Sequence, residues 1–262
     1  MLTVTFIRHG QSLDNLKSNW AGWKDAPLSE LGNKQAAALG KAFKASNTHF
    51  DFIYASDLLR ANTTGLSVLE AHDDPKPTFS SSPKLREQHF GVAEGQPWVL
   101  STPPGDQSLD ELFAQGIFPV LHSRNAKFPE GESLDDLARR ADGAVAEFLV
   151  PHLASPNNTH VAIASHGLCI SELVAALLRL DPQSRRDISY AGLRNTAWTR
   201  AVVTVKDGYS LPKYGAPPPL TVDITHVNVA DHLHTLESVE PLEEVDESKA
   251  SARAFFGGKA MV

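Results

Sequence analysis

The sequence is poor in several features that mark particular classes of protein. Its 262 residues include one cysteine, Cys169, so no disulfide can form within the chain and we expect a reducing compartment. No apolar run approaches the ~18 residues needed to cross a bilayer, so we expect no membrane-spanning helix. Basic residues number 24 against 31 acidic ones, and the resulting net charge of −7 gives no overall attraction for nucleic acid or acidic membranes.

The N-terminus also lacks the features of a signal peptide. The short apolar segment 2–7 leads directly into Arg8 and His9, with no basic start and no long apolar stretch. We therefore expect a cytoplasmic protein, with the nucleus left open, that binds neither membranes nor nucleic acid. The sequence does not indicate an oligomeric state. Its 42% of hydrophobic residues suffices for a sizeable core.

Apolar patterning predicts alternating strands and helices. Short apolar or β-branched segments predict strands at 2–7, 51–55, 160–164, 197–205 and 221–225. Apolar residues at helical spacing predict helices at 29–44, 56–70, 109–115, 133–149 and 168–180. We expect Ser56 to cap the second of these helices, and Ser133 with Asp136 to form a capping box on the fourth. Prolines within 72–83 favour a mostly connecting segment.

This alternation predicts an α/β fold, a three-layer sandwich with a mainly parallel central sheet flanked by helices. We expect a single domain over residues 1–235 and an acidic, mobile tail over 236–262. Phe255 and Phe256 in that tail are expected to fold back onto the body of the protein. The proline-rich region at about 95–131 is interpreted as a lid-like insertion.

Polar residues follow three predicted strands at their carboxyl ends, where parallel sheets bind ligands. Arg8-His9-Gly10 follows the first strand, Arg60 lies one turn into the next helix, and Ser165-His166-Gly167 follows a later strand. An uncharged histidine is a competent nucleophile, and arginine offers a planar fork of donors to phosphate oxygens. Asn15 could add an uncharged donor and Glu87 a carboxyl group. The pattern predicts that these groups converge on one anion.

In this order the segments resemble the histidine phosphatase superfamily, which includes the phosphoglycerate mutases. The resemblance starts with Phe6-Ile7-Arg8-His9-Gly10-Gln11-Ser12. It continues in segments at 27–36, 56–64, 85–95, 131–133, 165–167 and 195–196. It covers roughly residues 1–205, and the ordered set is far more specific than any one segment. The resemblance implies a phosphoglycerate mutase-like fold.

The resemblance also implies a role for each matching residue. His9 would be the nucleophile that forms a phosphohistidine, and Glu87 would give a proton to the leaving oxygen. The phosphoryl oxygens would be bound by Arg8, Asn15, Arg60, a cationic His166 and the backbone N–H of Gly167, which begins a helix.

Structural or alternative roles stay open for some of these residues. Glu94 could replace Glu87 as the acid or could merely brace its loop, and Asn15 could be a plain loop residue. Cys169 is expected to be a buried, inert thiol. His232 and His234 lack partners at metal-ligand spacing, so no metal site and no cofactor are expected.

Catalysis of phosphoryl transfer is mostly positioning and stabilisation of charge, which two arginines and a cationic histidine can supply without a metal. The segment 89–98 lacks the Gly-Leu-Asn-Lys run and the paired arginines of phosphoglycerate mutases. We therefore expect a metal-independent phosphomonoester hydrolase with a small phosphate ester, such as a sugar phosphate or bisphosphate, as substrate. His122, Arg124 and Lys127 in the insertion are candidates to meet a second anionic group. The alternatives are mutase-type transfer and a non-catalytic protein that binds phosphorylated ligands.

Overall fold

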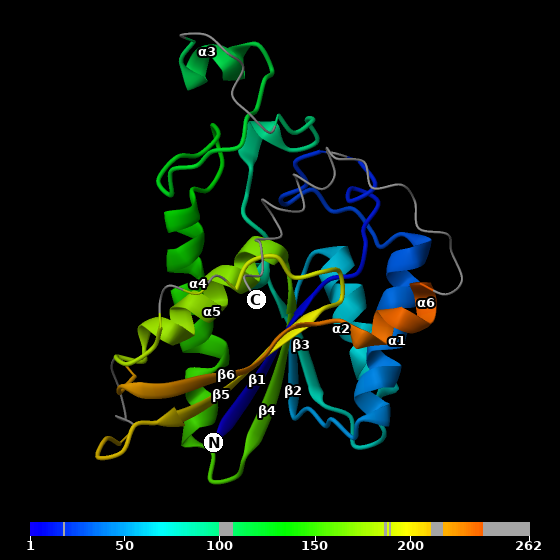
Figure 1. The fold of residues 1–262 in the computed structure, drawn as a ribbon, viewed down its shortest axis with the longest axis vertical. Coiled ribbons are helices and arrows are strands. Elements are labelled where there is room, and N and C mark those ends of the chain that lie inside the picture. Colours follow the sequence, from blue (N-terminus) through cyan, green and yellow to red (C-terminus); the bar gives the residue numbers. More distant parts are fainter. Residues whose placement is uncertain (18, 100–106, 186–187, 189, 211–216, 238–262) are drawn as a thin grey trace.

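One sheet forms the centre of the protein in a computed structural model that describes residues 1–17, 19–99, 107–185, 188, 190–210 and 217–237. The described residues form six strands: β1 (Leu2–Arg8), β2 (Phe52–Ser56), β3 (Thr78–Ser82), β4 (Thr159–Ser165), β5 (Trp198–Val205) and β6 (Leu220–Val229). Their order is β3-β2-β4-β1-β5-β6. The first four are mutually parallel, and β5 and β6 are antiparallel to their neighbours. The predicted mainly parallel sheet is confirmed (Figure 1).

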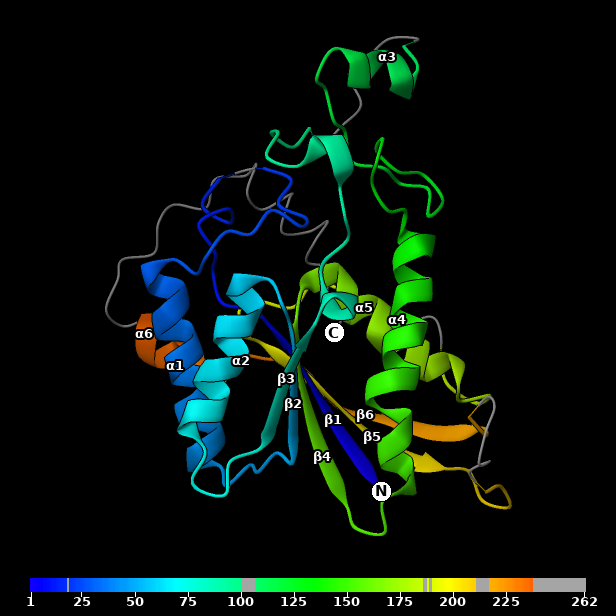
Figure 2. The ribbon, with the colours of Figure 1, turned by 180° about the vertical axis from the view of Figure 1, so that it is seen from behind.

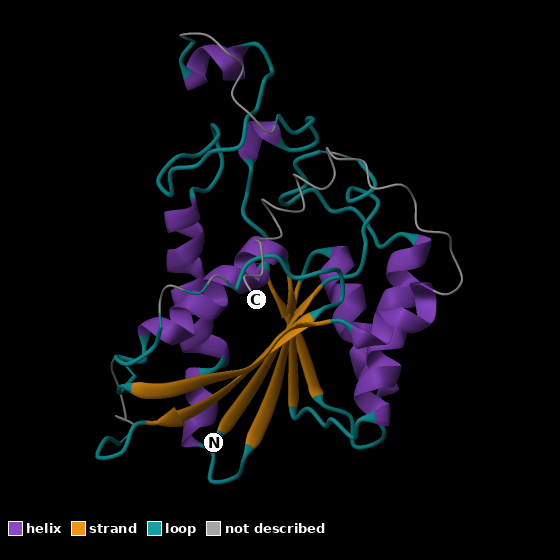
Figure 3. Cartoon of the chain, viewed as in Figure 1, coloured by secondary structure: helices purple, strands orange, loops and turns teal. Residues whose placement is uncertain are grey.

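Helices cover both faces of this sheet. The described residues form α1 (Glu30–Ala45), α2 (Leu59–Ala71), α4 (Leu134–Phe148), α5 (Gly167–Arg179) and the short α6 (His234–Glu237), besides α3 (Leu109–Ala114), which lies away from the sheet. Helices α1 and α2 lie on one face and α4 and α5 on the other, as seen from both sides in Figures 1 and 2. The expected capping box of Ser133 and Asp136 starts α4. The three-layer α/β sandwich is therefore confirmed (Figure 3).

Each face of the sheet carries its own hydrophobic core, and side chains that alternate along the strands contribute to both. Successive side chains of a strand point to opposite faces, so Phe6 packs with α4 and α5 while Ile7 packs with α1 and α2. In β4, Ile163 and Ala162 divide in the same way. Each fully buried side chain of this size contributes about 1.5–3 kcal/mol, so the two cores fix the strands and hence the loops at their carboxyl ends.

A third apolar cluster lies beyond the carboxyl ends of the strands. Trp20, Phe90, Phe118 and Phe128 form its buried centre. It joins the loop after β1 to the described part of the insertion, which carries α3 away from the sheet layers (Figure 3). Among the described residues, no helix is long and apolar enough to span a bilayer.

Two expectations about local structure are wrong. Segment 72–83 contains β3, an edge strand whose side chains are mostly exposed. Its partner β2 supplies the backbone hydrogen bonds, so the segment needs no apolar alternation that would reveal it. Ser56 ends β2 and does not cap α2, whose N-cap is Leu58. The acidic tail, with Phe255 and Phe256, lies outside the described residues apart from its start.

Candidate active site

The two predicted histidines lie side by side at the carboxyl edge of the sheet. Arg8 ends β1 directly opposite Ser165 at the end of β4, so the residues that follow, His9 and His166, are neighbours. Their ring centroids are 5.1 Å apart. His9 is 4% exposed and His166 fully buried. The parallel register therefore brings together two residues that are far apart in the sequence.

Hydrogen bonding defines which nitrogen of His9 can react. The Nδ1 of His9 lies 2.7 Å from the carbonyl oxygen of Gly10. A carbonyl can only accept, so Nδ1 carries the proton and Nε2 keeps its lone pair. Burial, together with Arg60 and Arg8, holds the pKa of His9 well below 6.5. His9 is therefore neutral at pH 7, the state that a nucleophile requires.

The loop after His9 is held closely against two helices. The Gly10 N–H donates to Thr64 Oγ1 over 3.1 Å, and this hydroxyl donates to the Arg60 carbonyl over 2.8 Å. A Cβ atom on Gly10 would lie 2.6 Å from the Gly32 carbonyl oxygen in α1. Only glycine allows this approach, so Gly10 fixes the backbone beside the His9 ring.

The predicted arginines surround the histidines. Arg60 is 2% exposed, and its guanidinium donates to the carbonyls of Gly22 and Lys24 over 2.7 and 3.0 Å. Arg8 donates to the Leu193 carbonyl. Both cations lower the pKa of His9 and of His166, which shows that their charges act on the same small volume. Two guanidinium groups are thus held close to the two histidines.

His166 differs from expectation in its charge. Its Nε2 shares a 2.9 Å hydrogen bond with Ser56 Oγ, and its Nδ1 is buried without a hydrogen-bond partner among the described residues. Burial first, then Arg60 and other nearby groups, hold its pKa well below 6.5. His166 is thus neutral in the empty site, not cationic. A phosphate dianion beside it would reverse this balance by favouring the protonated ring.

Glu87, which lies in a loop, places its carboxyl group next to the residues that follow His166. Its Oε1 accepts hydrogen bonds from the N–H groups of Cys169 and Gln88, both 3.0 Å away, and its Oε2 accepts from Leu168 over 3.2 Å. Leu168 and Cys169 lie in the first turn of α5, which starts at Gly167 directly after His166. The helix dipole favours a carboxylate there. A carboxyl group therefore stands at the N-terminus of the helix that His166 begins.

A clamp that the sequence analysis missed holds the backbone of Glu87. The Glu87 carbonyl accepts from Trp23 Nε1 over 2.7 Å and from Arg140 Nη2 over 2.9 Å. Arg140, in α4, also donates to the carbonyls of Lys84 and Arg86 over 3.0 and 2.6 Å. Its Nε and Nη2 pair with both carboxylate oxygens of Glu132 over 2.9 and 2.7 Å. We call Trp23, Glu132 and Arg140 the Glu87 clamp.

The remaining predicted polar residues have local partners. Glu94 accepts from the N–H groups of Trp23 and Phe90 over 2.7 and 3.1 Å, as a residue that braces its loop would. Asn15 is exposed, and its Oδ1 accepts from Ser12 N–H over 3.0 Å and from Asn195 Nδ2 over 3.4 Å. Asn195, also missed, donates to the His9 carbonyl over 3.1 Å. A role for Asn15 at the anion stays a prediction.

Arg124 and Lys127, two basic residues of the insertion, form ion pairs with carboxylates. Arg124 donates to Asp135 over 3.1 Å and to buried Glu172 over 2.9 Å. Lys127 lies 3.9 Å from Asp136. Both cations thus link the insertion to α4 and α5, and their contact with a second anionic group stays a prediction. His122, in the same loop, is exposed.

Two further expectations concern reactive or metal-binding side chains. Cys169 is fully buried, and burial raises its pKa to about 11, so its thiol is inert as expected. His232 shares a 2.9 Å hydrogen bond with Thr196 Oγ1. Within the described part of the chain, no three His, Cys, Asp or Glu side chains gather so that they could hold a metal ion.

Fold and site together define an α/β protein with paired histidines and arginines at the carboxyl edge of its sheet. The family model described as the histidine phosphatase superfamily (branch 1) matches residues 4–211, so the chain belongs to this superfamily. A 2,3-bisphosphoglycerate-dependent phosphoglycerate mutase from Bartonella henselae is 33% identical over 69% of this chain and 84% of its own. A probable phosphoglycerate mutase from Yersinia pestis is 30% identical over 76% of this chain and 84% of its own.

Solved structures with the same fold include phosphatases. A mycobacterial glucosyl-3-phosphoglycerate phosphatase, solved with VO3, has a TM-score of 0.58 and 24% identity, covering 85% of this chain and 97% of its own. A phosphoserine phosphatase from Entamoeba histolytica, solved with phosphoserine, has a TM-score of 0.59 and 22% identity, covering 89% of this chain and all of its own. The sequence relatives are thus named as mutases and these structural neighbours as phosphatases.

Proposed function

We propose that this protein is a metal-independent phosphomonoester hydrolase that acts on a small phosphorylated metabolite through a phosphohistidine at His9. The observation that carries the proposal is the state of His9: neutral, with Nδ1 protonated by its bond to Gly10, beside two arginines. The lone pair of Nε2 is therefore available in an anion-binding site. The names of the phosphatase neighbours support a small phosphorylated substrate.

In the first step, His9 Nε2 attacks phosphorus in line with the leaving oxygen. The P–N bond forms as the P–O bond breaks, and the released electron pair stays on the leaving oxygen. Arg8, Arg60 and His166 stabilise the three equatorial oxygens, with Asn15 and the Gly167 N–H as further donors. Glu87 takes up a proton when the phosphate dianion binds beside its carboxylate, and it gives this proton to the leaving oxygen, as an alkoxide requires.

In the second step, water attacks the phosphohistidine. The Glu87 carboxylate accepts a proton from this water as the new P–O bond forms. The P–N bond breaks, and its electron pair returns to Nε2. His9 regains the neutral tautomer that its bond to Gly10 favours, and inorganic phosphate leaves. The cycle balances without a metal or cofactor.

Mutase-type transfer is the second candidate, favoured by the 33% identity to a phosphoglycerate mutase. A mutase must hold a second charged group of its substrate so that the phosphoryl group returns to it instead of to water. Segment 89–98 lacks the basic residues that the family's mutases carry there, and Arg124 and Lys127 are paired with carboxylates. These observations favour hydrolysis.

The deciding experiment follows two products in parallel. The protein is incubated with 3-phosphoglycerate and 2,3-bisphosphoglycerate, and both inorganic phosphate and 2-phosphoglycerate are measured. A second incubation uses p-nitrophenyl phosphate, with His9→Ala as the control for contaminating phosphatase. Phosphate release that requires His9, without isomerisation, is expected. Isomerisation faster than phosphate release would establish the mutase, and no turnover of any ester would favour a binding protein.

A further inference from the structure

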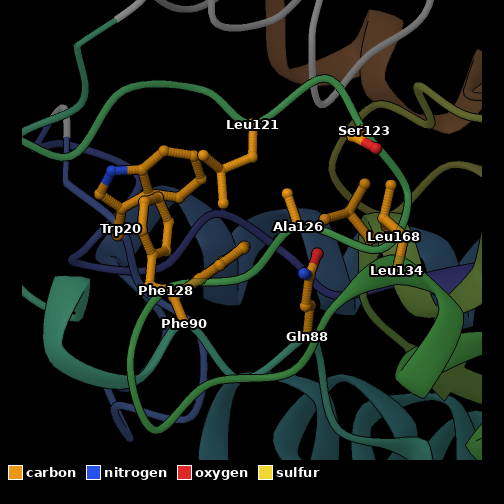
Figure 4. Close-up of a pocket in the computed structure, with 9 residues that line it drawn as sticks. All are labelled: Trp20, Gln88, Phe90, Leu121, Ser123, Ala126, Phe128, Leu134 and Leu168. Carbon is orange, nitrogen blue, oxygen red and sulfur yellow. The ribbon is translucent and has the colours of Figure 1, made fainter. Parts of the chain in front are cut away.

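An apolar pocket lies between the insertion and the first turns of α4 and α5 (Figure 4). Trp20, Phe90 and Phe128 form its aromatic side, and Leu121, Leu134 and Leu168 form much of the rest. The pocket is narrow: the centres of water-sized spheres fit into about 30 Å³ of it, within about 390 Å³ of empty space that includes open solvent. Its walls come from five separate segments, so it exists only when the insertion rests on the body of the protein.

The pocket adjoins the carboxyl group of Glu87 on two sides. Leu168 contributes its side chain to the pocket, while its N–H donates to Glu87 Oε2 over 3.2 Å. Gln88, the next residue after Glu87, also lines the pocket. The pocket lining does not include Glu87 or either histidine, but two of its residues adjoin Glu87, so the pocket is an apolar space beside the carboxyl group that would protonate the leaving alcohol.

The pocket offers one built polar contact. Gln88 is 7% exposed, and its Nε2 donates to the Glu132 carbonyl over 2.7 Å. This bond orients the amide, which points into the pocket in Figure 4, and leaves Oε1 as an acceptor on the pocket side. Ser123, at the rim, donates to Asn125 over 2.6 Å. A ligand can thus be apolar and give one hydrogen bond to Gln88.

Charge around the pocket disfavours a second anion. Arg124 flanks the lining residue Ser123 and is bound by Asp135 and Glu172. Lys127 follows the lining residue Ala126 and lies near Asp136. A carboxylate or phosphate in the pocket would lose its hydration against an apolar wall, and the nearest cations already share their charge with carboxylates.

We propose that this pocket binds the alcohol portion of the substrate, and that this portion is apolar and uncharged. The substrate class is then a phosphate monoester of an aliphatic or aromatic alcohol, rather than a bisphosphate or a phosphorylated acid. The proposal rests on the hydrolase function proposed above, because it takes Glu87 as the proton donor.

The test compares esters whose leaving oxygens are equally basic. Phosphate release from butyl, pentyl and hexyl phosphate is measured as kcat/KM, beside the phosphate ester of 6-hydroxyhexanoate. Each buried methylene should raise kcat/KM about two- to fourfold until the pocket is full. The terminal carboxylate of the last ester should lower kcat/KM at least about tenfold relative to hexyl phosphate.

Two pocket variants and one control locate the effect. Leu121→Lys should reduce the dependence on chain length and raise kcat/KM for the carboxylate ester, since its ammonium group would reach the pocket. Ala126→Leu should end the increase at a shorter chain by filling space. Val92→Lys, at an exposed residue that does not line the pocket, should keep the wild-type pattern. Thermal melts show whether each variant folds, and Ala126→Leu keeps the test decisive if Leu121→Lys does not.

Two failures can be told apart. Phosphate release from every ester with no dependence on chain length, or with a preference for the carboxylate ester, would overturn the pocket assignment and leave the hydrolase standing. Equal responses of Leu121→Lys and Val92→Lys would also overturn it. No phosphate release from any ester would overturn the hydrolase, and the pocket assignment with it.

Discussion

Replacement of Arg140 by methionine would open the Glu87 clamp. Arg140 and Glu132 have side chains only 14% and 20% exposed, and Arg140 donates to three carbonyls besides this carboxylate. Methionine keeps much of the buried length but donates nothing. Glu132 then keeps a largely buried charge, and within the described part of the chain the His89 N–H is the hydrogen-bond donor left to it. We expect loss of both stability and proton transfer.

The stability loss follows from burial. Removal of one partner of a buried ion pair costs about 3–5 kcal/mol, and partial exposure places Arg140→Met near the lower end. At this chain length, each kcal/mol lowers Tm by about 2–4 °C, so a drop of roughly 6–12 °C is expected. Arg179→Met is the matched control in a pair between α5 and α4. Arg179 and Asp142 are 38% and 54% exposed, and such pairs contribute about 0–1 kcal/mol.

The catalytic loss should depend on the leaving group. A displaced Glu87 delivers its proton poorly, which should slow hydrolysis of an alkyl phosphate strongly. Hydrolysis of p-nitrophenyl phosphate should hardly slow, because p-nitrophenolate leaves without a proton. We expect kcat/KM of Arg140→Met to fall about tenfold further on hexyl phosphate than on p-nitrophenyl phosphate, measured below the lowered Tm. Arg140→Lys should recover part of the stability. Equal losses on both substrates, or a Tm like that of Arg179→Met, would refute the reasoning.

Four shorter predictions follow. Arg60→Ala should lower kcat/KM at least ~10²-fold, and Arg60→Lys should recover only part, because an ammonium lacks the fork; near-normal kinetics would place Arg60 outside the site. Activity should persist in excess EDTA and be inhibited by vanadate, whereas loss on chelation that a divalent ion restores would contradict metal independence. The pKa of His9 lies well below 6.5, so kcat/KM, corrected for substrate ionisation, should hold from pH 7 to 6 and fall only at lower pH; half-maximal activity at pH 6.5 or above would contradict this. Burial lowers the pKa values of His160 and His232 to about 4, so between pH 4 and 6.5 the unfolded chain binds more protons than the folded one. The free energy of unfolding should therefore fall as the pH drops through this window. Urea titrations that show no such fall would contradict this prediction.

The central strands and the residues that follow them could be predicted from the sequence. Buried parallel strands are rich in apolar and β-branched side chains, and such segments stand out at Leu2–Arg8 and Thr159–Ser165. Their carboxyl ends share one edge, so the proximity of His9 and His166 follows from topology alone. Edge strand β3 leaves no such trace, because most of its side chains are exposed and only Phe79 packs on the core.

The Glu87 clamp and the neutral state of His166 could be recognised only from the three-dimensional structure. Arg140 lies eight residues after Glu132, a spacing that any helix surface can show, and its partners include three carbonyls that carry no sequence signal. The neutral state of His166 depends on complete burial next to Arg60, which a motif does not report. The same holds for the pairing of Arg124 with Glu172 across 48 residues.

The phosphoenzyme tests the account most directly. Brief incubation with a ³²P-labelled phosphate ester, followed by a quench that avoids acid, should yield protein-bound phosphate that is labile to acid and stable to base. Peptide mapping should place the label on His9, and His9→Ala should carry none. Label on a serine or aspartate, or turnover by His9→Ala at the wild-type rate, would contradict the phosphohistidine mechanism.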